Sequence, residues 1–504
     1  MSRRARRAGS AVRRPSPVTV ASAPREAATH ASCLVPHAFT PARGMHSHAS
    51  MALRFARLVA VFAVMVLSRR ALAATYYVAP GGSDSKGLGT LERPLGSISA
   101  AARRAVAGDT VSVRGGNYRE AVSIRGKHGR AQAPIVVRAY PGERPILDDR
   151  DVTDAQTAAI AVSDSSFVEL RGFEVAGSMF IGINVWSSHD VLVDGNIVRD
   201  CRRAGIYAGA PKPGISARIT FRDNTVTNCV LENEPRKMRV GWAQSVSTQY
   251  TDGATIVGNR IFRNYGEGIA LIVSSHGLVQ GNQLHDNYSV EIYLDNARYS
   301  TVDRNFISAT SDEKFYRGGL PATGIACANE TYKFTSPLTD LTITNNIVAW
   351  ARWGFYYGNY DRGGGLQNVT VANNTFYHSH EESIRVTPAS ASDPNVHHSG
   401  SVIANNIFDG FAGRPLAQVS GSGVSYHHNH WNGGTAAGVW LAASPTDTHG
   451  DPRFADPEGT RGAASFELQQ GSPCIDRGAA IPAVTADYFG RPRKGSYDIG
   501  AVER

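Results

Sequence analysis

Three acidic residues in the middle of the chain, Glu267, Glu291 and Asp295, are candidates for acid–base chemistry. Glu267 and Asp295 belong to successive repeats of the sequence. Two carboxyl groups about 5 to 9 Å apart are what glycoside hydrolysis requires, because one protonates the leaving oxygen while the other attacks or activates water. The alternative for Glu267 and Glu291 is a structural role, in which turn residues accept hydrogen bonds from backbone N–H groups.

The repeat that positions these residues is marked by an asparagine, which is followed two residues later by an apolar or aromatic residue. Its spacing is 23 residues where no insertion intervenes. The asparagines are Asn196, Asn224, Asn259, Asn282, Asn305, Asn346, Asn374, Asn406 and Asn429. Such a period with short β-branched runs predicts a solenoid. Because an Asn amide can both donate and accept, the asparagines can bond from coil to coil. We therefore expect an all-β fold, a single-stranded right-handed parallel β-helix.

The first 73 residues differ in composition from the rest. Residues 1–50 are rich in Arg, Ala, Ser and Pro, and we interpret them as a disordered extension or a mis-assigned start. Residues 51–73 have the order of a secretory signal peptide, with two arginines, an apolar core and Ala71-Leu72-Ala73. The alternative, a membrane anchor, would need roughly 20 apolar residues. We therefore expect export, to the cell exterior, the periplasm or the cell surface.

Removal of residues 1–73 changes the net charge of the chain. The formal charge of the whole chain is +9, but residues 1–73 hold 12 Arg and one acidic residue. The remainder carries a charge of about −2, so the composition does not favour nucleic acid as a partner. We expect a mature monomer without a membrane span.

Two cysteines, Cys201 and Cys229, each lie five residues after a ladder asparagine. Stacked strands place such positions about 4.8 Å apart. That separation allows a disulfide, and two stacked buried thiols are the alternative.

The mature sequence divides into an N-terminal cap with first coils (74–150), the β-helix (151–435) and a C-terminal closing segment (436–504). Several motifs resemble secreted bacterial β-helix proteins of the pectate-lyase-like superfamily. They are Tyr77-Val-Ala-Pro-Gly-Gly-Ser-Asp, Gly116-Asn-Tyr and Ala133-Pro-Ile-Val-Val-Arg-Ala-Tyr-Pro-Gly. Gly471-Ser-Pro-Cys-Ile-Asp-Arg-Gly and Asp498-Ile-Gly-Ala-Val-Glu resemble the choice-of-anchor Q segment that ends many such proteins.

The asparagine register predicts which strand residues face outward. The core-facing row is Ile206, Val246, Ile269, Ile292, Ile325, Phe355 and Ile384, and the outward row is Tyr207, Ser247, Ala270, Tyr293, Ala326, Tyr356 and Arg385. Insertions at 230–242, 311–337 and 358–367, the last containing Tyr360, should wall this face. We predict that Tyr207, Tyr293, Tyr356, Tyr360 and Arg385 bind a polysaccharide, since rings stack on sugars and polar groups reach hydroxyls and carboxylates. Cross-coil tyrosine pairing is the alternative.

The resemblance also implies a second chemistry. Lyases of the superfamily remove a proton beside a uronate carboxylate, with Lys or Arg as base and often Ca²⁺ as the neutralising cation. Lys314 and Lys333 are the candidate bases, and solvated loop charges are the alternative. No metal ligand set is predicted, and calcium stays open as a cofactor. The sequence thus predicts an extracellular, acidic-glycan-binding β-helix protein that acts as a lyase or hydrolase. A non-catalytic glycan-binding protein is the alternative.

Overall fold

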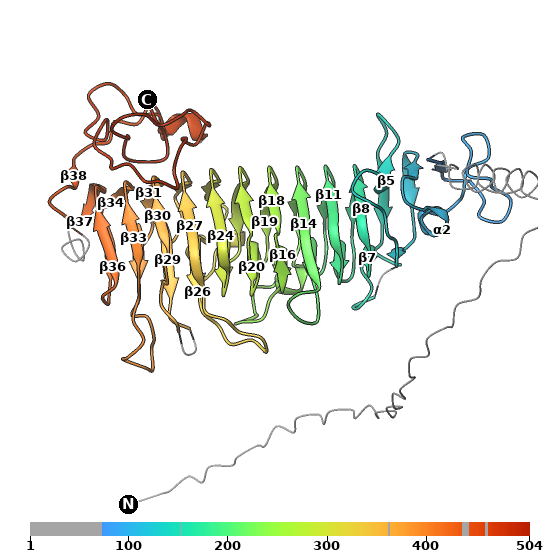
Figure 1. The fold of residues 1–504 in the computed structure, drawn as a ribbon, viewed down its shortest axis with the longest axis horizontal. Coiled ribbons are helices and arrows are strands. Elements are labelled where there is room, and N and C mark those ends of the chain that lie inside the picture. The colour runs from blue at the N-terminus through green and yellow to red at the C-terminus, as the bar shows by residue number, and fades with distance from the viewer. Residues whose placement is uncertain (1–72, 153, 361–362, 436–442, 459–461) are drawn as a thin grey trace, which may run out of the picture. The chain divides into compact units, whose positions relative to one another are not determined.

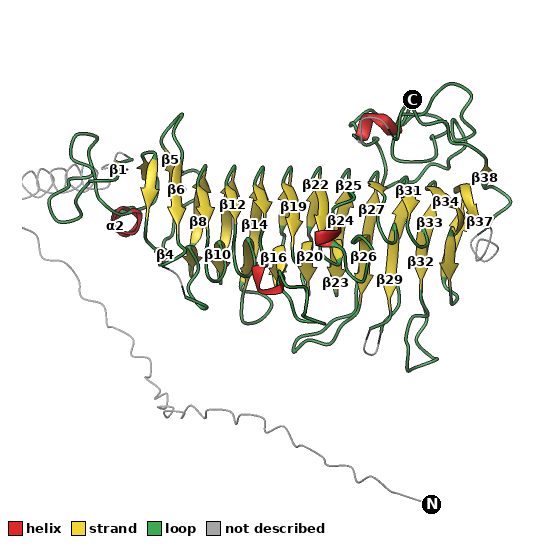
Figure 2. Ribbon diagram, turned by 180° about the vertical axis from the view of Figure 1, so that it is seen from behind, coloured by secondary structure: helices red, strands yellow, loops and turns green. Residues whose placement is uncertain are grey.

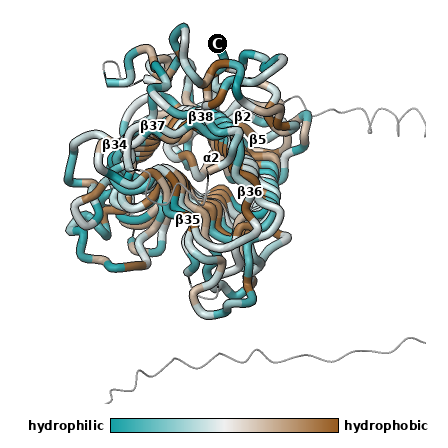
Figure 3. Tube along the Cα trace, turned by 90° about the vertical axis from the view of Figure 1, so that its left-hand side faces the viewer, coloured by the Kyte–Doolittle hydropathy of each residue, from teal (hydrophilic) through white to brown (hydrophobic). Residues whose placement is uncertain are grey.

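The computed structural model describes residues 73–504 apart from 153, 361–362, 436–442 and 459–461. Residues 1–50 and nearly all of the predicted signal peptide lie outside this range. The described strands form a parallel β-helix, in which three sheets of 14, 11 and 13 strands run along one axis. Along that axis the strands of successive coils superpose around a common interior (Figure 3). Among the described residues no helix is long and apolar enough to cross a membrane.

The 11-stranded sheet, called the site sheet below, contains β4 (Val122–Arg125), β7 (Ile160–Ser163), β10 (Ile183–Trp186), β13 (Ile206–Gly209), β16 (Gln244–Gln249), β20 (Glu267–Ile272), β23 (Val290–Asp295), β26 (Thr323–Ala328), β29 (Phe355–Gly358), β32 (Ile384–Val386) and β35 (Ala417–Val419). Its strands lie side by side in chain order (Figure 1).

The other two sheets complete each coil. The 14-stranded sheet contains β1 (Thr75–Val78), β2 (Thr110–Val113), β5 (Ile135–Ala139), β8 (Ser166–Arg171), β11 (His189–Asp194), β14 (Ser216–Arg222), β17 (Thr251–Asp252), β18 (Thr255–Val257), β21 (Leu278–Gln280), β24 (Arg298–Asp303), β27 (Thr339–Thr344), β30 (Thr370–Ala372), β33 (Ser401–Ala404) and β36 (Val424–His427). The 13-stranded sheet contains β3 (Gly116–Tyr118), β6 (Pro145–Asp148), β9 (Glu174–Ala176), β12 (Ile197–Arg199), β15 (Thr225–Thr227), β19 (Arg260–Asn264), β22 (Gln283–Asn287), β25 (Phe306–Ser308), β28 (Ile347–Ala349), β31 (Thr375–Ser379), β34 (Ile407–Pro415), β37 (His430–Thr435) and β38 (Thr448–His449).

The asparagine ladder is continuous. Each side-chain amide from Asn196 to Asn406 donates to the Oδ1 atom of the next ladder asparagine, at 2.9–3.1 Å. The same oxygen also accepts from the backbone N–H of the preceding asparagine, as at Asn259 and Asn282. These amides are buried, so the bonds satisfy polar groups that water cannot reach. The ladder therefore fixes the register of successive coils.

The predicted register of the site sheet is confirmed. Ile206 pairs with Val246, and the pairing continues through the predicted core row to Ile384. The outward row from Tyr207 to Arg385 follows in the same pairs. The side chains of this row therefore share one face of the solenoid.

Strict alternation stops where the site strands begin. The residue before the first core-facing one turns inward as well, and it is often glycine. At Gly324 an added Cβ would lie 2.3 Å from Val348 Cγ1, and at Gly354 it would lie 2.6 Å from Phe376 Cδ1. The corner is therefore too tight for most side chains, and the residue one place earlier, such as Glu267, projects outward.

Elements other than these strands lie near the ends of the described chain and in its loops. Near the N-terminus helix α2 (Ile98–Arg104) begins at Ser97, whose hydroxyl accepts from the N–H of Ala100. Three short 3₁₀ helices, η1 (Leu231–Asn233), η2 (Glu313–Phe315) and η3 (Ala463–Phe466), lie in loops. The C-terminal segment lies along the flank of the last coils (Figure 1), where Arg493 donates to Asn345 Oδ1 at 3.0 Å.

Cys201 and Cys229 are buried, unbridged thiols on neighbouring coils. The structure thus shows the stacked-thiol alternative, without the disulfide.

Candidate functional site

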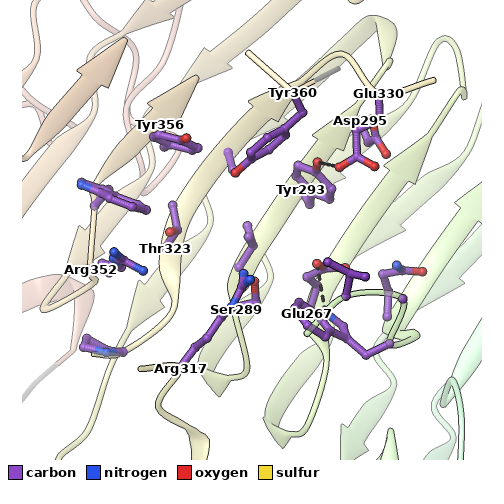
Figure 4. Close-up of a pocket in the computed structure, with 18 of the residues that line it drawn as sticks. Glu267, Ser289, Tyr293, Asp295, Arg317, Thr323, Glu330, Arg352, Tyr356 and Tyr360 are labelled. Carbon is purple, nitrogen blue, oxygen red and sulfur yellow. Dashed lines mark hydrogen bonds between the residues drawn. The ribbon is translucent and has the colours of Figure 1, made fainter. Parts of the chain in front are cut away.

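The insertions and the outward row of the site sheet enclose a cavity of about 410 Å³, called the acidic pocket here. Long loops gather at the edge of the coils that carry β23, β26, β29 and β32 (Figure 2). Figure 4 shows the pocket's side chains converging from several strands and loops. The chemically functional lining residues are Glu267, Asp295, Glu330, Arg317, Arg352, Tyr293, Tyr332, Tyr356, Tyr360, Trp242 and Trp353.

Glu267 is the carboxyl group at the start of β20. One of its oxygens accepts a hydrogen bond from Trp242 Nε1 at 3.1 Å, and the other, Oε2, is buried without a partner. Burial raises the pKa of Glu267 to about 7. Because an unpartnered buried carboxyl oxygen is costly, its retention in a cavity points to a ligand contact.

Asp295 is the second acid of the pocket, at the end of β23. Tyr332 donates to its Oδ2 atom, while Oδ1 is buried without a partner. Burial, and then the nearby charge of Glu330, raise the pKa of Asp295 to about 8. Glu330 accepts in turn from the hydroxyl of Tyr293. Asp295 therefore holds a proton at neutral pH beside a third carboxyl group.

Cations and aromatic rings form the rest of the wall. The guanidinium of Arg317 lies 4.7 Å from the ring centroid of Trp242 and donates to Ser289 Oγ at 2.9 Å. Arg317 makes no salt bridge with any residue that the structure describes. Arg352 is paired with Glu381 at 2.8 Å and lies over Trp353. Arg317 is thus a cation available to an anionic ligand.

Several predicted catalytic residues lie elsewhere. Glu291 points into the coil interior, where its two oxygens accept from the N–H and the side-chain amide of Asn287. It ends a second, short ladder that begins with the bond from Asn264 to Asn287. Lys314 and Lys333 are exposed and do not line the acidic pocket. Glu291 therefore has a structural role as a hydrogen-bond acceptor, because the tight corner turns its side chain inward. The two lysines are solvated loop charges.

Four of the five predicted sugar-binding residues line one of two neighbouring cavities, and Arg385 lines neither. Tyr293, Tyr356 and Tyr360 line the acidic pocket, and Tyr356 stacks on Trp353 with centroids 4.7 Å apart. Tyr207 lines a neighbouring cavity toward the N-terminal coils. Arg385 lies beside the acidic pocket, 3.5 Å from Glu382 and over the Trp353 ring.

Sequence reasoning did not select the lining residues Arg352, Trp242 and Trp353, nor Glu330, Arg317 and Tyr332. The last three belong to the predicted insertion 311–337, which was expected only to wall the groove. An insertion has no counterpart in the repeat, so its register could not be aligned. The signal that was present is the density of charged and aromatic residues in this one loop.

The described residues contain no group of three or more His, Cys, Asp or Glu side chains placed to hold a metal ion.

Two family models match the chain. The model of the Pel9A-like right-handed β-helix region matches residues 76–296, and that of the right-handed β-helix region matches residues 236–392. The fold is therefore the predicted right-handed parallel β-helix. Arg317 and Glu330 lie beyond the first match and within the second.

One named relative is similar to the chain in sequence, and two solved structures are similar to it in fold. Pectate lyase PEL9 of Emericella nidulans is 31% identical over 218 residues, which are 42% of this chain and 46% of that protein, so the match spans less than half of its length. The crystal structure of pectate lyase Pel9A has a TM-score of 0.54 at 17% identity, covering 86% of this chain and 96% of that one. The complex of XylC with xylose has a TM-score of 0.56 at 14% identity, covering 85% and 98%. At these identities the two structures show likeness of fold alone.

Proposed function

We propose that this protein is a carbohydrate-active enzyme that hydrolyses a glycosidic bond of an extracellular polysaccharide in the acidic pocket. The observation that carries the proposal is the pair Glu267 and Asp295. Both have raised pKa values, and each directs a buried oxygen without a partner into one cavity. The similarity to a relative named as a pectate lyase supports a polysaccharide as the substrate class.

Asp295 is the proton donor in this proposal. Its pKa of about 8 keeps it protonated at neutral pH, so it can protonate the leaving glycosidic oxygen. The hydrogen bond from Tyr332 holds one carboxyl oxygen in place. The charge of Glu330 disfavours loss of the proton from Asp295 before the sugar binds.

Glu267 is the second carboxyl group, which attacks the sugar or activates water. A pKa of about 7 makes it a base matched to neutral pH. Trp242 Nε1 fixes one oxygen and leaves Oε2 for the reaction. Tyr293 lies on the floor between Glu267 and Asp295, where its ring can stack on the sugar (Figure 4).

Arg317 supports an acidic glycan as the substrate. A guanidinium without an ion pair can bind a uronate carboxylate through two parallel hydrogen bonds. With Asp295 protonated, Arg317 also limits repulsion between an anionic sugar and the remaining carboxylates.

Elimination is the second candidate, and the similarity to a pectate lyase favours it. Within the described pocket, Arg317 would then be the base in place of Lys314 or Lys333. Calcium belongs to this second candidate, as the cation that would neutralise the uronate.

One assay separates the candidates. The purified protein is incubated with acidic and neutral polysaccharides, with calcium or with EDTA. Hydrolysis predicts new reducing ends without ultraviolet absorbance from an unsaturated product. Absorbance that grows with the reducing ends would support elimination instead. Binding without new ends would favour the non-catalytic alternative.

Export is also part of the proposal, because the order of residues 51–73 is that of a signal peptide. Expression of the full chain with its leader, followed by N-terminal sequencing of protein in the medium or periplasm, tests it. A start at Ala74 is expected, and an uncleaved cytoplasmic product would contradict export.

A further inference from the structure

The second cavity of the site sheet differs in chemistry from the acidic pocket. It has a volume of about 600 Å³ and is called the aromatic pocket here. Its main lining residues are Phe180, Asn184, Trp186, Tyr207, Ser247 and Gln249. Trp242, Gln244 and Tyr332 line both cavities, so the two are neighbours along one groove.

The aromatic pocket has a ring platform. Trp186 stacks on Tyr207 with centroids 6.4 Å apart and planes 21° apart. The Tyr207 ring lies across Gly209, where an added Cβ would be 2.5 Å from the tyrosine hydroxyl. That hydroxyl donates to Gln249 Oε1 at 3.0 Å, which holds the ring in place. Trp186 remains 36% exposed, so one apolar ring is open to a ligand.

Uncharged polar atoms face the same space. Asn184, Tyr207 and Ser247 pair across three successive strands, so they belong to one outward row. The Asn184 Oδ1 and Ser247 Oγ atoms are buried without hydrogen-bond partners, and Ser247 is 0% exposed. A ligand hydroxyl would satisfy both atoms.

The pocket carries almost no net charge. Among the described residues that line it, Arg203 is the charged one, and Glu232 neutralises it at 3.2 Å. The acidic pocket by contrast holds three carboxyl groups and two arginines. Rings with neutral donors and acceptors suit an uncharged sugar, whereas a uronate would lack a cationic partner here.

We propose that the aromatic pocket binds an uncharged sugar residue of the same glycan whose bond is cleaved in the acidic pocket. Tyr207 and Tyr293 are three strands apart, which corresponds to about 14 Å, more than the length of one pyranose ring. The preferred substrate is therefore a mixed glycan, with a neutral residue on the N-terminal side of the groove. This inference rests on the proposed function for the cleavage step but not for binding.

Binding is measured by calorimetry in the full protein carrying Glu267→Gln, which prevents turnover. The probes are neutral gluco-, xylo- and galacto-oligosaccharides, oligogalacturonate, and mixed oligosaccharides. The test variant is Trp186→Ala, and Asn184→Ala is a second. Tyr299→Ala is the matched control, because Tyr299 is 46% exposed and stacks on His276 in another sheet.

We expect a neutral or mixed oligosaccharide to bind and Trp186→Ala to raise its Kd about tenfold, with Tyr299→Ala unchanged. Thermal melting that is unaltered by Trp186→Ala would confirm an intact fold. The inference is overturned if no neutral or mixed probe binds, or if Trp186→Ala leaves the Kd unchanged.

The two proposals fail in different ways. If a probe binds in a Trp186-dependent way but the wild type never cleaves it, the hydrolase proposal fails and the binding inference stands. Cleavage of oligogalacturonate with kcat/KM unaffected by Trp186→Ala, together with no binding of neutral probes, would remove this inference alone.

Discussion

Glu267 and Asp295 face one pocket from opposite ends of neighbouring strands, since Glu267 is the first residue of β20 and Asp295 is the last of β23. The register pairs Ile269 with Ile292, so the two Cα atoms are offset by five residues along the strands, about 16 Å. Their side chains point into the space between, over Tyr293. Because hydrolysis requires carboxyl groups about 5 to 9 Å apart, the two side chains must span part of this offset across Tyr293.

The pH dependence of cleavage follows from these two carboxyl groups. Glu267 must be ionised, so kcat/KM should rise as pH increases through about 7. Asp295 must be protonated, so kcat/KM should fall as pH increases through about 8. We predict a narrow, bell-shaped profile whose two limits belong to the interacting pair. A profile that is flat from about pH 5 to pH 9 would contradict these roles.

Arg317→Ala should weaken binding of acidic substrates. Because the guanidinium is expected to contact the substrate in the ground state and the transition state alike, KM should rise about tenfold or more while kcat changes little. The control is Arg218→Ala, since Arg218 is an exposed arginine paired with Asp190 in another sheet. Steady-state kinetics on an acidic and a neutral glycan measure the effect. An equal loss on both substrates would argue against recognition of a carboxylate.

Glu291 should affect stability rather than catalysis. Burial raises its pKa in the folded state to about 8, above the ordinary 4.5. The unfolded chain therefore loses this proton at lower pH, and the stability of the wild type should fall as pH rises from about 4 to about 8. Glu291→Gln removes this contribution to the slope. Glu267 and Asp295 act in the same direction, so part of the slope should remain.

Denaturant unfolding at pH 5 and pH 8 measures this effect. Between these pH values, the wild type should lose roughly 2–4 kcal/mol of unfolding free energy relative to Glu291→Gln. If the unfolding free energies of the two proteins changed equally between pH 5 and pH 8, the pKa of Glu291 would not be raised by folding.

The asparagine ladder makes a separate prediction for Asn282. Its amide donates to Asn305 Oδ1 and to the Ile256 carbonyl, and its oxygen accepts two bonds from Asn259. Asn282→Ala leaves these buried groups unsatisfied and should cost about 3 kcal/mol or more of unfolding free energy. Asn395→Ala, at an exposed loop position, should stay within about 0.5 kcal/mol. Urea unfolding measures the free energy of unfolding of both variants. A loss for Asn282→Ala as small as that for Asn395→Ala would mean that the ladder adds no stability.

The fold and the outward row could be predicted because the repeat ties sequence distance to position. Once Asn282 and Asn305 bond, Tyr293 and Asp295 must lie on the outer face of their strand. Glu291 could not be assigned in this way, since strict alternation ends at the tight corner before Ile292.

The insertion 311–337 was equally beyond the reach of the repeat. Arg317, Glu330 and Tyr332 take their places from contacts with Ser289, Tyr293 and Asp295, and no periodic signal encodes those contacts. The sequence therefore indicated the face that holds the site, while Glu330 and Arg317 could be placed in it only from the structure.

The most direct test of the central claim is the release of reducing ends from acidic and mixed glycans by the wild type, Glu267→Gln, Asp295→Asn and the control Glu174→Gln. Glu174 is a carboxylate paired with Arg199 on another sheet. We predict cleavage by the wild type and the control, and a loss of kcat by about 10²- to 10⁴-fold in each pocket variant. Undiminished cleavage by both pocket variants would contradict the assignment of catalysis to this pocket.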